Sequence, residues 1–168
     1  MKSAQEDEYL EFVAARAKAL YRSAYALAAG DMHLAEDLVQ ETLSRVYVHW
    51  KRVAGADSPG AYAQTVLVRT FLSLRRRRST GERPTGNMPD SPESGPDAAL
   101  RITLLDALGQ LPPRDRAVLL LRYWEGRSIE ETGQMLRLSS SAVRSQGTRA
   151  LGRLRALLGD SLSDLVPQ

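Results

Sequence analysis

The chain has 168 residues, enough for one ordinary domain or two small ones, and it contains no cysteine, which excludes disulfides, thiol nucleophiles and cysteine-bound metals. Its net charge of +3 conceals two basic stretches, because residues 69–83 carry +5 and residues 114–168 carry +3, whereas residues 1–68 carry −2 and residues 84–113 carry −3. Basic stretches separated by an acidic one favour an anionic partner, and solvated surface arginine is the equally simple alternative.

Helical signals fill the first half of the chain. Residues 5–29 form a first predicted helix, and Asp31 can cap a second helix over about residues 32–52. Ser58 is followed by a proline, which is a typical N-cap and first helical residue, and this pair predicts a third helix to about residue 78.

A stretch rich in proline, glycine and serine follows the third helix. Residues 79–97 read STGERPTGNMPDSPESGPD and show no apolar periodicity, so they are predicted to form a flexible linker. The linker separates residues 1–78 from residues 98–168, and each part is large enough to form a small domain.

The second half is also predicted to be helical. Helices are expected over residues 97–110, 112–126, 128–136 and 140–158, and Glu131 completes a capping box at the start of the third of these. The chain contains no run of alternating β-branched residues. The predicted fold class is therefore all-α, with two small helical domains joined by a flexible linker.

The second helix has an apolar and a polar side. Helical spacing places a core stripe on one side, formed by Val39, Leu43, Val46 and Trp50. The other side carries Asp37, Gln40, Glu41, Ser44 and Val48. A solvated acidic face explains the carboxylates, but a valine among them favours a surface that docks on another protein.

The third helix combines an apolar stripe with a face suited to nucleic acid. The stripe consists of Ala63, Leu67, Phe71 and Leu74. The other side carries Tyr62, Thr65, Arg69, Leu72, Ser73 and Arg76. An aromatic ring can stack on a base and guanidinium groups can meet phosphates, as in proteins that bind single strands. The four arginines at residues 75–78 exceed what the helix dipole alone explains.

The last two helices have the lengths and the turn of a helix-turn-helix. In the final helix the inward residues are Val143, Ala150, Leu151, Leu154 and Leu158. The outward and flanking residues are Ser141, Arg144, Ser145, Gln146, Thr148, Arg149, Arg153 and Arg155. Arginine and glutamine can read base edges in the major groove, whereas serine and threonine can bind phosphates. Plain packing of a helix pair with a basic outer face is the alternative.

The sequence shows no catalytic constellation. Glu130 and Glu131 are adjacent and point in different directions, and His33 and His49 lie too far apart on one helix to share a metal. We therefore expect no enzymatic activity, no metal and no cofactor. No apolar run approaches the ~18 residues of a membrane span, and the acidic N-terminus lacks a signal-peptide core, so we expect a cytoplasmic protein without membrane insertion.

Four segments together resemble the extracytoplasmic-function sigma factors of bacterial RNA polymerase, and the resemblance covers nearly the whole chain outside the linker. The segments DMHLAEDLVQETLSRVYVHW and SPGAYAQTVLVRTFLSLRRRR resemble the core-binding and −10-element parts of sigma region 2. The segments LLDALGQLPPRDRAVLLLRYWEGRSIEETGQML and RLSSSAVRSQGTRALGRLRALL resemble sigma region 4. AEDLVQE is the most specific part of the match, and the order and spacing of the segments add to it.

The resemblance implies a role for each face. Residues on the second helix would bind core polymerase at the coiled coil of its β′ subunit: Asp37, Leu38, Gln40, Glu41, Ser44 and Val48. The third helix, with the VAGAD loop before it, would capture the non-template strand of the −10 element through Tyr62, Thr65, Arg69, Ser73, Arg75 and Arg76. The last helix would read the −35 element through Ser141, Arg144, Ser145, Gln146, Thr148, Arg149 and Arg153.

The resemblance also implies partners, namely the β′ and β subunits of core polymerase, promoter DNA and an anti-sigma factor, which is common in the family. The linker would thread toward the polymerase active-site channel. Four positions depart from the family pattern and bear on base-level specificity: Arg69, where asparagine is common, Gly133, Arg137 and Gly147. Two alternatives are a stand-alone helix-turn-helix regulator and a protein adaptor that binds no DNA. A plain repressor needs neither the AEDLVQE face nor the basic face of the third helix.

Overall fold

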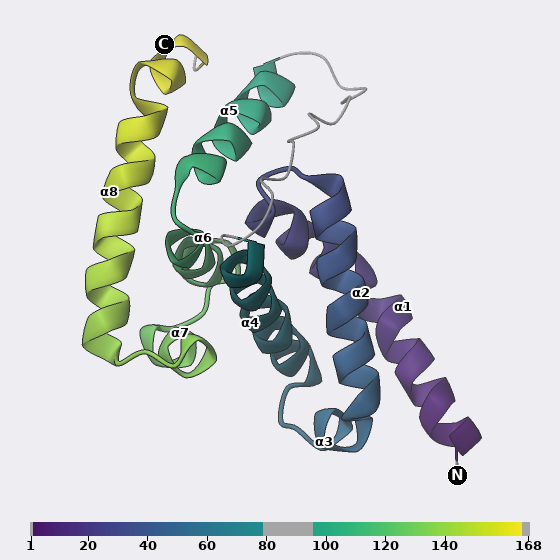
Figure 1. Cartoon of the computed structure of the whole chain (residues 1–168). Coiled ribbons are helices and arrows are strands. Elements are labelled where there is room, and N and C mark those ends of the chain that lie inside the picture. The colour runs from purple at the N-terminus through teal and green to yellow at the C-terminus, as the bar shows by residue number, and fades with distance from the viewer. Residues whose placement is uncertain (1, 79–95, 166–168) are drawn as a thin grey trace.

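The computed structural model describes residues 2–78 and 96–165, with side chains placed for residues 3–74 and 97–159. The first half contains α1 (Lys2–Leu27), α2 (Met32–Val48), α3 (Trp50–Ala54) and α4 (Pro59–Arg78), as Figure 1 shows. The second half contains α5 (Pro96–Gln110), α6 (Pro113–Leu119), the π-helical turn η1 (Leu120–Trp124), α7 (Ile129–Leu136) and α8 (Ser140–Leu165). The described residues form helices and connecting turns without strands, which confirms the predicted all-α class.

Side-chain caps fix the starts of three helices. The Asp31 carboxylate accepts the backbone N–H of the third residue after it at 3.1 Å, and the Ser58 hydroxyl does the same at 3.1 Å. At α7 the capping box is complete, because the Ser128 hydroxyl accepts the Glu131 N–H at 3.0 Å and the Glu131 carboxylate accepts the Ser128 N–H at 3.1 Å. The hydrogen bond from the Ser128 backbone lowers the pKa of Glu131. These caps confirm the predicted starts.

The prediction of one continuous helix over residues 32–52 is wrong at His49. This residue has φ −107° and ψ 28°, outside the helical region, and separates α2 from α3. The break lets the Trp50 ring pack against α1, with its centroid 5.7 Å from that of Tyr9 and 5.4 Å from that of Phe12. Packing between aromatic rings thus overrides a helical pattern that contains no glycine or proline at the break.

The predicted helix over residues 112–126 divides into α6 and η1. The Glu125 N–H reaches back to the Leu120 carbonyl at 2.8 Å, which is the wider spacing of a π-turn. The last helix was predicted over residues 140–158. The regular part of α8 matches this prediction, because the backbone departs from helical geometry at Gly159, with φ 20° and ψ −124°.

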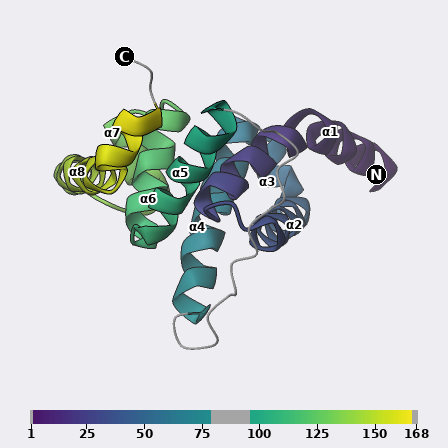
Figure 2. The ribbon, with the colours of Figure 1, turned by 90° about the horizontal axis from the view of Figure 1, so that it is seen from above.

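The two halves pack against each other around a shared core. In Figures 1 and 2 the second half lies along the first, and α4 contacts both α6 and α7 while α1 contacts α5, α6 and η1. One apolar cluster draws residues from both halves, including Leu27, Leu67, Phe71, Leu121 and Met135. The helices themselves were predictable from the sequence, whereas this docking of one half on the other was not. Residues 79–95 of the predicted linker lie outside the described residues, and residues 96 and 97 already belong to α5.

The turn between α7 and α8 explains two of the unusual positions. A Cβ atom added to Gly133 would lie 2.6 Å from the Leu138 carbonyl oxygen, so the turn approaches the helix too closely for a side chain. The Leu138 N–H donates to the Gly133 carbonyl at 2.8 Å, which holds this approach. Arg137 ends α7 in the left-handed conformation, with φ 57° and ψ 47°, where a glycine is commoner.

Alanine substitutions at two buried glycines are expected to have opposite effects. Gly133→Ala should lower the free energy of unfolding by about 1–3 kcal/mol, because backbone must move to admit the methyl group. Gly147→Ala should raise it by about 1 kcal/mol, because its methyl group would meet Val118 at an ordinary 3.6 Å and alanine is the better helix former. Urea denaturation followed by circular dichroism measures both values. Equal effects of the two substitutions would contradict the geometry of the turn.

Candidate functional site

The polar side of α2 is an exposed acidic face. Asp37, Gln40, Glu41 and Ser44 are exposed, and Val48 is 74% exposed at the end of the helix. The Glu41 carboxylate accepts hydrogen bonds from Arg45 at 3.1–3.2 Å, an ion pair across one helical turn. The opposite side of α2 packs against α1 and α4. The structure therefore gathers these five residues on one surface open to a partner, which we call the α2 face.

The structure corrects the prediction that Leu38 belongs to the polymerase-binding surface. Its side chain is 0% exposed and belongs to the apolar core, so it is not part of the α2 face. The predicted core stripe was also displaced, since Val39 and Leu43 are only half-buried. The buried residues of α2 are Leu34, Ala35, Leu38, Thr42 and Val46. Two covering helices, α1 and α4, shift the buried side away from the stripe expected from periodicity alone.

The predicted −10 face of α4 is partly covered. Tyr62, Thr65 and Ser73 are half-buried, and the Thr65 hydroxyl donates to the Ala61 carbonyl of its own helix at 2.9 Å. The side chains of the predicted residues Arg75 and Arg76 lie outside the described residues, although α4 includes their backbone. The predicted buried stripe is confirmed for the three residues Ala63, Leu67 and Phe71, which are 0% exposed.

Arg69, at the centre of this face, is bound to the other half of the chain. Its Nε donates to the Met135 carbonyl at 2.8 Å and its Nη2 donates to the Gln134 carbonyl at 3.0 Å. Both carbonyls belong to the last turn of α7. Burial lowers the pKa of Arg69, and the nearby charge of Arg137 lowers it further. The structure thus places Arg69 against the end of α7, with its side chain half-buried.

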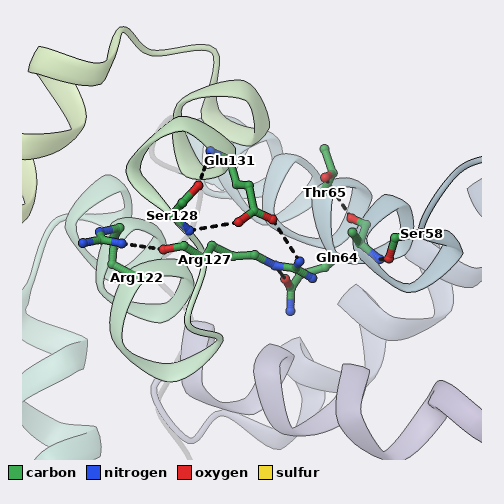
Figure 3. A network of polar contacts seen from close by, with 8 residues as sticks. Ser58, Gln64, Thr65, Arg122, Arg127, Ser128 and Glu131 are labelled. Carbon is green, nitrogen blue, oxygen red and sulfur yellow. Dashed lines mark hydrogen bonds and ion pairs between the residues drawn. The ribbon is translucent and has the colours of Figure 1, made fainter.

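Three more polar contacts join the halves. Figure 3 shows Arg127 between Gln64 of α4 and Glu131 of α7, with its Nε 2.8 Å from the Gln64 Oε1 and its Nη1 3.3 Å from the Glu131 carboxylate. The Ser23 hydroxyl donates to the Glu125 carboxylate at 2.5 Å. The third contact is made by Arg116, whose Nη1 donates to the Leu27 carbonyl at 2.8 Å and whose guanidinium lies 5.3 Å from the Phe71 ring centroid.

Sequence reasoning missed these residues that join the two halves. The clearest signal is in α6, where Asp115 and Arg116 sit beside a run of apolar residues and are 2% and 4% exposed. Charged side chains are seldom buried without a partner, so two of them next to an apolar run indicate polar contacts inside the protein.

The outward face of α8 is exposed and polar. Ser139 caps the helix by accepting the Ala142 N–H at 3.2 Å. Exposed side chains then follow over the first half of the helix, with Gln146 half-buried beside them: Ser141, Arg144, Ser145, Thr148 and Arg149. We call these six residues the α8 face. Val143 and Ala150, on the inward side, are buried as predicted.

Arg153 differs from the other predicted DNA-binding residues of α8. Its Nη1 lies 2.6 Å from a carboxylate oxygen of Asp115, whose side chain is 3% exposed. Burying a carboxylate without a cation is unfavourable, so this ion pair ties α8 to α6. Arg153 therefore has a packing role that the sequence did not reveal.

Neither a membrane span nor a metal centre occurs within residues 2–78 and 96–165. No helix in these ranges is both long and apolar enough to cross a bilayer, and no three histidine, aspartate or glutamate side chains gather there to hold a metal ion.

Comparison with known proteins links both halves to one family. Residues 12–80 match the family model described as Sigma-70 region 2, and residues 107–156 match the model described as Sigma-70, region 4. The chain is 38% identical over 150 residues to the RNA polymerase sigma-E factor of Streptomyces coelicolor, covering 88% of this chain and 84% of that protein. It is 32% identical over 151 residues to the ECF RNA polymerase sigma factor SigL of Mycobacterium tuberculosis, covering 84% of each.

A solved structure shares the fold. The sigma factor RpoE of Bartonella quintana, crystallised in complex with the anti-sigma factor NepR, superposes with a TM-score of 0.74. The match covers 90% of this chain and 96% of that chain at 22% sequence identity, so the likeness concerns the fold.

Proposed function

The chain belongs to the sigma-70 family, in its extracytoplasmic-function group, and from this premise we propose how its surfaces direct core RNA polymerase to promoters. The α2 face docks on the polymerase, while α4 and α8 recognise two promoter elements. The observation that carries the proposal is that an exposed acidic face and an exposed basic face lie on different halves of one chain. Catalysis belongs to the polymerase, and the chain acts with it in the cytoplasm as a non-enzymatic initiation factor.

We assign residues 1–78 to region 2, residues 79–97 to the linker and residues 98–168 to region 4. Support comes from the family matches at residues 12–80 and 107–156 and from α4 ending at Arg78. In the working complex the linker threads toward the polymerase active-site channel and tethers the two DNA-binding parts.

The α2 face binds the coiled coil of the β′ subunit. Asp37 and Glu41 supply negative charge, and the exposed side chain of Val48 supplies apolar contact at the end of the same face. Interfaces combine such an apolar contact with a charged rim that selects the partner, and both features are present here.

The outer side of α4 binds the non-template strand of the −10 element. Tyr62 stacks on a flipped base, while Arg69, Arg75 and Arg76 bind phosphates and the hydroxyl groups of Thr65 and Ser73 add polar contacts. Capture of flipped bases offsets the cost of unstacking them, which promotes DNA opening. Support comes from the aromatic and guanidinium groups that share this side of one helix.

The α8 face reads the −35 element in the major groove. Arg144, Gln146 and Arg149 are suited to base edges, and Ser141, Ser145 and Thr148 are suited to phosphates. Support comes from the exposure of this face at the start of the second helix of a helix-turn-helix. Arg153 contributes positive charge beside the face while it remains paired with Asp115.

An anti-sigma protein is a further proposed partner. Support comes from the Bartonella sigma factor, which was crystallised with one. Such a partner would act on this chain by covering the surfaces that bind polymerase, the α2 face among them.

Removal of either exposed arginine of the α8 face should weaken promoter binding. Arg144→Ala and Arg149→Ala are each expected to reduce the affinity of the reconstituted polymerase for a promoter by about 1–3 kcal/mol, with the loss concentrated at −35 positions. Filter binding to promoters with and without a mutated −35 element measures this. The control is Arg22→Ala, which removes the same charge from an exposed site on α1. A uniform loss on both promoters would contradict a base-reading role and leave only a phosphate contact.

A selection experiment tests the proposed function as a whole. Core polymerase with and without this chain is incubated with fragments of genomic DNA, and retained fragments are sequenced. We expect fragments that share two short elements to be enriched only when both proteins are present. Enrichment by the chain alone would instead support a stand-alone regulator, and no enrichment beyond core polymerase would contradict the proposal.

A further inference from the structure

A cavity of about 580 Å³ lies where α1 meets the second half of the chain. Its walls come from α1, α5, α6, η1 and α8, and Figures 1 and 2 show α5 between α1 and α8. The leucines of α5, α6 and α8 that line it are Leu104, Leu105, Leu108, Leu119, Leu151 and Leu154. Cavities that hold small molecules usually measure about 300–1,000 Å³ and have mainly apolar walls. The size and the walls therefore suit a small molecule with an apolar body.

Aromatic rings from both halves add to the wall of this cavity. Tyr21 and Tyr25 lie on consecutive turns of α1, with ring centroids 6.2 Å apart. Tyr123 and Trp124 come from η1 and are 58% and 61% exposed, which is high for large aromatic side chains. They belong to a π-turn, a geometry that is frequent at functional sites. A ligand with an apolar body would cover these rings and remove apolar surface from water.

The charged side chains described around the cavity are all positive. Arg22 of α1, Arg101 of α5 and Arg116 of α6 line it, and none of the described residues that line it is acidic. Arg22 and Arg101 are exposed, whereas Arg116 is 4% exposed and donates to the Leu27 carbonyl. Like charges around one cavity repel each other, and a guanidinium binds a carboxylate through several donors. The cavity is therefore complementary in charge to an organic anion.

We propose that this cavity binds an amphiphilic organic acid, an apolar chain or ring system that carries one carboxylate. The apolar body fills the space between the leucines and the aromatic rings, and the carboxylate binds the arginines at the cavity. The site shares no residue with the α2 face, the α8 face or the residues assigned to the −10 element, so it is separate from the proposed polymerase and promoter contacts. A bound acid contacts both halves and stabilises the folded chain.

Dodecanoate serves as the probe, and two compounds with the same apolar chain separate the body from the head group. Dodecan-1-ol has no charge, and dodecylamine has the opposite charge. Isothermal titration calorimetry should show that the full chain binds dodecanoate about tenfold more tightly than dodecan-1-ol, and dodecylamine most weakly. In a Trp50→Phe background, Trp124 emission should shift to shorter wavelength as dodecanoate covers the ring. The unfolding temperature should rise with the dodecanoate concentration.

Two variants test the head group and the body separately. Arg101→Gln should lower the affinity for dodecanoate about tenfold and leave the affinity for dodecan-1-ol unchanged, because it removes the charge and keeps most of the side chain. Ala26→Phe places a ring at the cavity wall and should lower the affinity for both compounds about tenfold, because space for the apolar body is lost. Arg114→Gln, at an exposed site of α6 outside the cavity, is the matched control and should bind both compounds as the parent chain does. Thermal unfolding without ligand checks the fold of each variant.

Four outcomes would overturn the proposal. Equal affinities for the three compounds would leave apolar binding without a site for the carboxylate. Equal losses in Arg101→Gln and Arg114→Gln would place the anion outside the cavity. Binding of an acidic amphipathic helical peptide at Trp124, with no binding of dodecanoate, would assign the cavity to a protein partner. Self-association of the chain that shields Trp124 without ligand would assign it to a second copy.

Discussion

Replacing both Asp37 and Glu41 by arginine is expected to weaken binding to core polymerase by about 100-fold, or about 2.7 kcal/mol. Both carboxylates are exposed on the α2 face, and reversing them places positive charge where the proposed partner surface is complementary to negative charge. Glu41→Arg also removes the ion pair with Arg45, but exposed pairs contribute little to stability. The fold should therefore survive, and the loss should concern the partner.

Titration of a fluorescent chain with core polymerase measures this affinity. The matched control replaces Glu6 and Glu8 by arginine, because these exposed residues of α1 undergo the same change of charge away from the α2 face. Thermal unfolding of both double variants checks the fold. An equal loss of affinity in the control would show that net charge, and not the α2 face, governs binding.

Phe71→Ala is expected to lower the free energy of unfolding by about 3–5 kcal/mol. The Phe71 side chain is fully buried in the cluster that draws on both halves, and the Arg116 guanidinium lies over its ring. Truncation leaves a cavity and removes the apolar face against which Arg116 packs. The substitution should destabilise both halves, because they share this core.

Urea denaturation followed by two signals separates a shared core from two independent ones. In a Trp124→Phe background Trp50 reports on the first half, and in a Trp50→Phe background Trp124 reports on the second, since these are the two tryptophans of the chain. We expect both signals to move together to lower urea in Phe71→Ala, and Phe71→Leu to cost less than about 1.5 kcal/mol as a milder change of volume. A shift of the Trp50 transition alone would mean that the halves unfold independently.

Local features of the fold were predictable because they depend on residues that are close together in the sequence. Asp31, Ser58 and Ser128 each offer a cap at a fixed distance from the N–H that needs it, and the structure uses all three. The exposed α8 face follows from helical periodicity in the same way. The departures at Gly133 and Arg137 were visible in the sequence, but their meaning needed the close approach of the Leu138 carbonyl.

The docking of the halves was not predictable because periodicity shows that a side is buried without naming what covers it. Leu38 was assigned to a binding surface because it lies within the AEDLVQE motif, whereas α1 and α4 enclose it. The pattern of polar residues on its own helix predicted that Arg69 contacts DNA. Its partners in the structure are backbone carbonyls of α7, which no side-chain pattern reveals.

Transcription from a selected promoter by core polymerase tests the central claim most directly. The claim is that this chain supplies promoter recognition and DNA opening to an enzyme that lacks them. We predict a transcript of defined start that requires both proteins, and its loss when the −10 or the −35 element is mutated. Binding of the chain to the same promoter without core polymerase, with no transcript when both are present, would contradict the account.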